Sequence, residues 1–293
     1  MGDVLIASLL FAGCNIGWRL GSGPAIGVVG LRAAIGAFVA VGITRRRSSG
    51  PWLDPLRLRS GRVAVAVQVV GLIVAGTMFR TLDGPLAGLA IACTPAVALL
   101  VRDRSGRLAT AAALGSSLAA IVGLSIAAGD GVDAVTWAGA SVAVLFVAVE
   151  VIGLRTSEVA VEDGVNPATL VSSTMVSGAM ILLPLGLVFG TLREPGTLWG
   201  ALLGALIVAV LGTIARVLRT AALPAAGVTA VAASSQVNAL FTAFGGLVIF
   251  GDITSGVSLF CTFAAAGLGA VAVVAAARWR LARQPELGLA LDS

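Results

Sequence analysis

The chain is divided into ten apolar stretches, each close to the length of a membrane-spanning helix. A helix that crosses the ~30 Å hydrocarbon core of a bilayer needs about 20 mostly apolar residues. Short segments rich in Gly, Pro and Asp separate most of the stretches, as expected for turns. They run roughly over residues 4–19, 25–44, 63–79, 84–101, 108–128, 134–154, 168–190, 198–217, 225–250 and 256–277. The pattern predicts an all-α integral membrane protein with ten transmembrane helices.

The arginines predict the orientation of these helices. If the N-terminus is cytoplasmic, 15 arginines fall on the cytoplasmic side and three, Arg19, Arg80 and Arg193, fall on the outer side. Because basic residues are enriched in cytoplasmic loops, we expect a multi-pass protein of the plasma (inner) membrane with both termini in the cytoplasm. The cytoplasmic set includes Arg216 and Arg219, which we place at the end of the eighth span and in the loop that follows it.

The two halves of the chain repeat a motif. Residues 80–88 and 219–227 both read Arg-Thr, three residues, Pro, one residue, Ala-Gly, at a shift of 139 positions. Each half holds five spans, an odd number, so a repeated second half must enter the membrane from the opposite side. Repeats of this kind are common in transporters, where the substrate site lies near the bilayer midplane. We therefore predict two inverted five-helix repeats, residues 1–128 and 134–278, followed by a cytoplasmic tail, residues 279–293.

The composition supports the membrane assignment and excludes several functions. The chain is 58% hydrophobic and 11% charged, with mean hydropathy +1.04. Its net charge of +5 comes from arginines spread over short loops, so the lipid bilayer is the expected partner and a nucleic acid is not. The chain has no Lys and no His, which removes the Walker A lysine and the usual imidazole base and metal ligand. We expect no catalytic site, no metal and no cofactor.

Two charged residues lie inside predicted spans, where each costs about 2.5 to 3.5 kcal/mol. Arg32 is in the second span and Glu150 in the sixth. From their positions along the helices they differ in depth by ~12 Å, so we expect each to face a watery cavity separately. Arg32 is either a counter-charge for a substrate carboxylate or phosphate, or a packing residue bonded to backbone carbonyls. Glu150 is either a proton-coupling or cation-binding carboxylate, or an interface residue that pairs with Arg155.

Uncharged polar residues also gather near mid-membrane. The ninth span contains Gln236 and Asn238, and the fourth contains Thr94 and Pro95, which frees a backbone carbonyl. Such groups have no water to bond in hydrocarbon, so they either line a cavity or join helices by hydrogen bonds. The candidates for a substrate cavity are Asn15, Trp18, Arg32, Gln68, Thr94, Pro95, Gln236 and Asn238.

These features, in this order, resemble the drug/metabolite transporter superfamily and in particular its EamA-type branch of ten-helix proteins. The resemblance runs from about Ile6 to Arg278. It is carried by LLFAGCNIGWR, by GLRAAIGAFVAVGITRRR, by Pro85 with TPAVALLVRD, and by Pro224 with LVIFGDITSGVSLFCTFAAAGLGAV. The chain departs from the family pattern at the acidic residue before the last helix of each repeat, which is usually Glu and is here Asp252 or Asp103.

The resemblance implies a secondary transporter that moves small metabolites, often amino acids or drug-like solutes and often outward, by alternating access through a central cavity. Many such proteins couple transport to protons, and we take Glu150 to be the only buried acid available for this. Two alternatives remain open: a lipid-linked or nucleotide-sugar carrier of the same fold, and a membrane scaffold that transports nothing. We do not expect an enzyme, because the only adjacent acids, Glu162 and Asp163, fall in a predicted cytoplasmic loop and the chain has no His.

Overall fold

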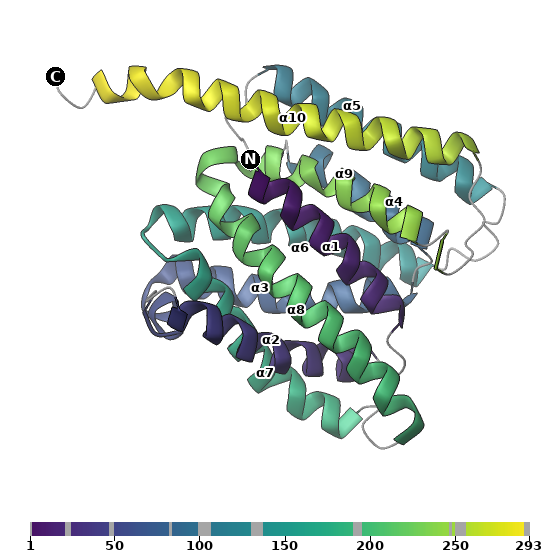
Figure 1. Ribbon diagram of the computed structural model, residues 1–293, viewed down its shortest axis with the longest axis vertical. Helices are drawn as coiled ribbons and strands as arrows, with labels where there is room; N and C mark the ends of the chain where they lie inside the picture. The colour runs from purple at the N-terminus through teal and green to yellow at the C-terminus, as the bar shows by residue number, and fades with distance from the viewer. Residues whose placement is uncertain are drawn as a thin grey trace.

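The computed structural model describes residues 2–20, 25–46, 50–81, 84–98, 107–129, 137–189, 195–245, 248–249 and 256–289. Within these ranges the chain forms ten α-helices and a short 3-10 helix, with no strand (Figure 1). In chain order the elements are α1 (Gly2–Leu20), α2 (Ala25–Arg46), η1 (Asp54–Arg57), α3 (Arg59–Thr81), α4 (Gly84–Ala98), α5 (Arg107–Gly129), α6 (Trp137–Glu162), α7 (Pro167–Phe189), α8 (Pro195–Ala226), α9 (Val228–Gly245) and α10 (Gly256–Leu289). Each predicted apolar stretch corresponds to one α-helix, which confirms the all-α prediction.

Three helices continue well beyond the stretches that predicted them: α6, α8 and α10. The clearest case is α8, where we ended the span at residue 217, just after Arg216, and placed Arg219 in the loop. The helix continues to Ala226 and ends at Gly227, which has φ +82. The Gly227 amide donates a hydrogen bond to the carbonyl of Leu223 at 2.8 Å. The placement of Arg219 in a loop was therefore wrong.

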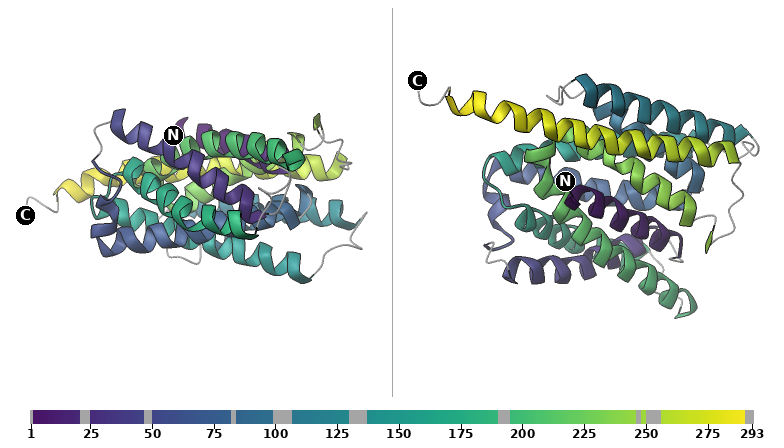
Figure 2. Two further views of the ribbon diagram at one scale, coloured as in Figure 1. Left: turned by 90° about the horizontal axis from the view of Figure 1, so that it is seen from below. Right: turned by 45° about the horizontal axis from the view of Figure 1, so that its top comes forward.

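The helices pack in a pattern that repeats after five helices. α2 packs against α7, α4 against α9 and α5 against α10. The contact of α1 with α8 has a counterpart in that of α6 with α3, and the contact of α1 with α9 in that of α6 with α4. Figures 1 and 2 show α5 and α10 along one edge of the bundle, while Figure 1 shows α2 and α7 at the opposite edge. The remaining helices lie between these two pairs.

The bundle presents large apolar side chains on its outside and keeps polar ones inside. Phe38, Val144 and Phe260 are 82%, 72% and 72% exposed, whereas Arg32 and Gln236 are buried. Four helical segments are long and apolar enough to cross a membrane, namely Ile26–Arg46, Arg59–Phe79, Pro167–Val188 and Leu202–Ala226. Gly2–Trp18 and Phe263–Ala276 are shorter apolar helical segments.

Glycine allows α2 and α7 to approach closely. A Cβ atom added at Gly30 would lie 2.7 Å from the carbonyl oxygen of Leu182 and 3.1 Å from the Cα of Leu183. Both are backbone atoms, which cannot move without shifting α7. Gly42, on the same helix, has no atom within 4 Å of such a Cβ. Only the first of these two glycines is required for the packing of α2 on α7.

Candidate functional site

A cavity lies between the helices, with a volume of ≈ 1020 Å³ that includes space open to solvent. Residues of α1, α3 and α4, of α6, α8 and α9, and Arg32 of α2 line it. Its polar lining residues are Ser8, Asn15, Arg32, Gln68, Thr94, Glu150, Ser157, Arg216, Arg219, Thr220, Ser234, Ser235 and Asn238.

Most of the residues singled out in the sequence line this cavity. They are Asn15, Trp18, Arg32, Gln68, Thr94, Asn238 and Glu150. Pro95 and Gln236 are buried but are not among the described residues that line it. A Cβ atom at Gly269 of α10 would lie 3.1 Å from the Cβ of Gln236, so Gln236 packs toward α10. Because successive helical residues are 100° apart, Gln236 and Asn238 leave α9 in different directions.

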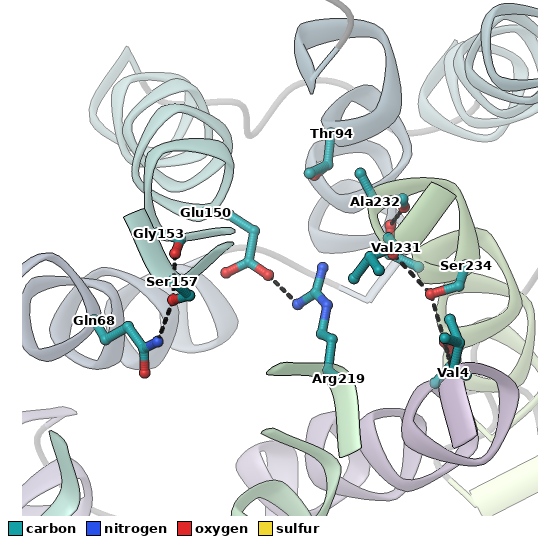
Figure 3. Close-up of polar contacts among 12 residues, drawn as sticks. Val4, Gln68, Thr94, Glu150, Gly153, Ser157, Arg219, Val231, Ala232 and Ser234 are labelled. Carbon is teal, nitrogen blue, oxygen red and sulfur yellow. Dashed lines mark hydrogen bonds and ion pairs between the residues drawn. The ribbon is translucent and has the colours of Figure 1, made fainter. Parts of the chain in front are cut away.

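Hydrogen bonds between helices use several of the same polar residues. The Asn15 side-chain amide donates to the Asn238 carbonyl oxygen at 2.9 Å, which joins α1 to α9. On the other side of the cavity, the Gln68 amide of α3 donates to the hydroxyl oxygen of Ser157 on α6 at 2.6 Å (Figure 3). The Thr174 hydroxyl of α7 donates to the Gln68 carbonyl oxygen at 3.2 Å. Asn15, Gln68 and Asn238 therefore line the cavity and also join helices.

Four charged side chains line the cavity together. Arg219 and Glu150 form an ion pair between α8 and α6, with side chains 13% and 23% exposed (Figure 3). Arg32 and Arg216 are the other two charged side chains among the described lining residues. The expectation that Arg32 and Glu150 face separate cavities was wrong. It compared depths along the helices, whereas this cavity extends along α6 from Phe146 to Ser157, a rise of ~16 Å.

Two of the guanidinium groups also lie over aromatic rings. The Cζ atom of Arg32 is 5.1 Å from the ring centroid of Trp18. The Cζ atom of Arg219 is 5.5 Å from that of Phe11. A cation over an aromatic face is attracted to the ring while keeping its full charge. These rings therefore position positive charge at the cavity wall without neutralising it.

The structure corrects two further expectations about Glu150. Its pairing with Arg155 does not occur, because Arg155 instead forms an ion pair with Glu158. Glu158 is only 3% exposed, so Glu150 is not the only buried acid. We missed Glu158 because we ended the sixth span at residue 154, although α6 continues as helix to Glu162.

The sequence interpretation also missed Arg216 and Arg219 as lining residues. A signal for them was present in the sequence. Arg216 and Arg219 are three positions apart in an otherwise apolar helix, and residues at that spacing share a helix face. Thr220, one position later, lines the cavity with them. A charged, one-sided stripe on an apolar helix is typical of a helix that faces a polar interior.

The groups in this cavity are suited to binding a solute. They are guanidinium, carboxylate, amide, hydroxyl and aromatic side chains, which recognise charge and hydrogen-bonding groups. Among the residues that the structure describes, there is no group of three or more His, Cys, Asp or Glu side chains that could hold a metal ion.

Comparison with known proteins shows the fold. No family model matches the chain, and no curated protein matches it. A solved structure described as "Crystal structure of protein" is similar, with TM-score 0.70 and 16% sequence identity. The match covers 94% of this chain and 99% of that one. The two proteins therefore share a fold along nearly their whole length, and at this identity the likeness extends to the fold alone.

Proposed function

We propose that the protein is a secondary transporter that moves small metabolites across a membrane by alternating access through the cavity between its helices. The observation that carries this proposal is the cavity itself. It places charged and hydrogen-bonding groups inside a bundle whose exterior is apolar. A membrane scaffold that transports nothing has no need for such a lining, because polar groups in a bilayer interior are costly.

The packing pattern supports two repeats of opposite orientation. Contacts recur with a shift of five helices, as expected if residues 1–128 and 134–278 are copies of one unit. The cavity is lined by α1, α3 and α4 and by their counterparts five helices on, α6, α8 and α9. A site shared by two repeats in this way is the arrangement used for alternating access. With five helices in each copy, the second copy is inverted relative to the first.

The same proposal includes ten membrane crossings in the plasma (inner) membrane, with both termini in the cytoplasm. Large exposed apolar side chains such as Phe38 and Phe260 then face lipid. Removing Arg216 and Arg219 from the 15 cytoplasmic arginines leaves 13 against three on the outer side. The charge bias therefore still favours this orientation.

Membership of the drug/metabolite transporter superfamily is part of the proposal and rests on the motifs in the sequence. The solutes expected from the resemblance are amino acids or drug-like compounds, moved outward. A nucleotide-sugar carrier of the same fold is the second candidate, and the arginines of the cavity favour it, because guanidinium groups bind phosphate well. Glu150 stays the candidate for proton coupling, now as the ion-pair partner of Arg219.

A transport assay in liposomes tests the proposal. Purified protein is reconstituted and screened against amino acids, cationic drugs and nucleotide sugars, with and without a pH gradient. For a solute that is moved, Asn238→Ala should lower the rate about tenfold, because it removes a cavity group that binds Asn15. Thr156→Ala is the matched control, since this hydroxyl bonds only to backbone carbonyls of its own helix among the described contacts. Equal loss in both variants, or no uptake of any class, would contradict the proposal.

A further inference from the structure

The charge of the cavity is unbalanced. Its described lining includes three guanidinium groups, those of Arg32, Arg216 and Arg219, and one carboxylate, that of Glu150. With all four ionised, the lining carries a net charge of +2. Elsewhere in the bundle a buried acid is matched, because Glu158 has Arg155 as its partner. The described lining of the cavity, in contrast, has more positive than negative groups.

Each of these arginines also has a buried hydrogen-bond donor without a partner among the described residues. The Nε atoms of Arg32 and Arg216 and one terminal nitrogen of Arg219, Nη2, are buried and have no hydrogen-bond partner among the described residues. Arg32 is only 3% exposed. A buried cation without a partner is costly, and a bound anion would offset this cost for all three. Since Glu150 already pairs with Arg219, the groups most available to a ligand are Arg32 and Arg216.

Arg32 of α2 and Arg216 of α8 come from different helices but line the same cavity. Both also act electrostatically on Glu150. Arg32 is held between Trp18, over whose ring it lies, and Gly212 of α8. A Cβ atom at Gly212 would lie 3.1 Å from Nη2 of Arg32. The absence of a side chain at this position thus leaves room for the guanidinium group beside α8.

We propose that the cavity binds an organic anion, a solute with a carboxylate or phosphate group attached to an apolar body, with Arg32 and Arg216 holding the anionic group. The apolar body would lie against the aromatic part of the lining, which includes Phe11, Phe79 and Phe146. Glu150 acts as a built-in counter-ion that keeps Arg219 paired. Guanidinium groups suit this task because they bind carboxylate and phosphate with two parallel hydrogen bonds. This inference rests on the proposed function and narrows its substrate class.

The same charges predict what the cavity rejects. An organic cation of the same shape would meet two uncompensated positive charges, and like-charge contacts of this kind oppose binding. Removing a positive charge and removing the negative charge should therefore change the affinity for an anion in opposite directions. Loss of Arg216 weakens binding, and loss of the Glu150 carboxylate, which competes with the ligand for the guanidinium groups, strengthens it.

The experiment measures binding to the purified protein in a nonionic detergent by isothermal titration calorimetry. The probes are benzoate and phenyl phosphate as anions, with benzylamine and benzyl alcohol as a cation and a neutral compound of similar shape. Arg216→Gln should raise the Kd for benzoate about tenfold or more, and Glu150→Gln should lower it about tenfold. Arg216→Lys, which keeps the charge, should bind better than Arg216→Gln. Arg45→Gln, at the exposed end of α2, is the control and should leave the Kd unchanged.

The outcomes separate the possible answers. Benzylamine binding as tightly as benzoate, or Arg216→Gln and Glu150→Gln shifting the Kd in the same direction, would overturn the proposal. If Arg216→Gln does not fold, the direction of the Glu150→Gln shift decides alone. A short-chain phosphatidylglycerol tests whether the anionic group belongs to a lipid headgroup. If the protein binds this lipid but binds neither benzoate nor phenyl phosphate, the assignment of a soluble solute is overturned.

Binding and transport can fail independently. Anion binding without uptake in liposomes would leave this site in place and remove the proposed transporter. Uptake restricted to neutral or cationic solutes, without benzoate binding, would leave the proposed transporter in place and remove the anion site.

Discussion

The ion pair between Glu150 and Arg219 should be energetically asymmetric. Replacing Glu150 by Gln leaves three guanidinium groups and no carboxylate among the described lining residues of the cavity. Replacing Arg219 by Gln leaves the carboxylate in the field of Arg216 and Arg32, which also act on it. We therefore predict that Glu150→Gln destabilises the protein more than Arg219→Gln does.

The exposed fractions of the pair set the size of the effect. At 13% and 23% exposure the two side chains are mostly buried. Removing one partner of a fully buried pair costs about 3–5 kcal/mol, and an exposed pair contributes about 0–1 kcal/mol. We expect Glu150→Gln to lower the free energy of unfolding by about 3 kcal/mol. We expect about 1 kcal/mol for Arg219→Gln, because the remaining arginines replace part of the lost attraction.

The assay is unfolding of the purified protein by SDS in mixed micelles, with the double mutant completing a thermodynamic cycle. The ion pair between Arg57 and Asp54 is the control, because its side chains are 78% and 41% exposed and its closest atoms are 3.7 Å apart. Its coupling energy should be below ~1 kcal/mol. Benzoate should restore stability to Glu150→Gln, since a ligand that binds only the folded state stabilises it. Equal losses in both single mutants, or a larger loss in Arg219→Gln, would refute the reasoning.

Two further predictions use matched pairs. Gly30→Ala should lower the free energy of unfolding by about 1–3 kcal/mol, because its Cβ meets the backbone of α7. Gly42→Ala, in open space on the same helix, should raise the free energy of unfolding by up to about 1 kcal/mol, because Ala has the higher helix propensity. If SDS unfolding shows that both substitutions stabilise, or that both destabilise, the prediction is contradicted. For transport, Glu150→Gln should abolish the dependence on a pH gradient while Glu158→Gln keeps it; an unchanged pH profile in Glu150→Gln would remove the coupling role.

The sequence was sufficient to predict the helices and much of the cavity lining. A span-length apolar stretch has few alternatives to a helix in a bilayer, and a polar residue in such a helix needs a polar neighbour, which is how Asn15, Gln68 and Asn238 were found. Which side a polar residue faces depends on how the helices are rotated against each other. Hydropathy does not contain that information, so Gln236 was grouped with Asn238 although it packs toward α10.

The charged residues show a second limit of the sequence. We treated Arg216 and Arg219 as the end of a span, because a charge usually marks the water interface. In the structure α8 continues past them and their side chains line the cavity. Glu158 was missed for the same reason on α6. A local hydropathy average ends a helix at a charge. The folded helix continues where its charges line a polar cavity, as Arg216 and Arg219 do, or pair along the same helix, as Glu158 does with Arg155.

The central claim is that two five-helix units of opposite orientation enclose the cavity within the membrane. It is tested most directly by labelling single cysteines with a membrane-impermeant maleimide in vesicles of known orientation, after the three native cysteines are replaced. Arg57→Cys and Asp163→Cys should react from the cytoplasmic side, and Ser22→Cys and Gly131→Cys should react from the outer side. Labelling of Arg57→Cys and Gly131→Cys from the same side would contradict it.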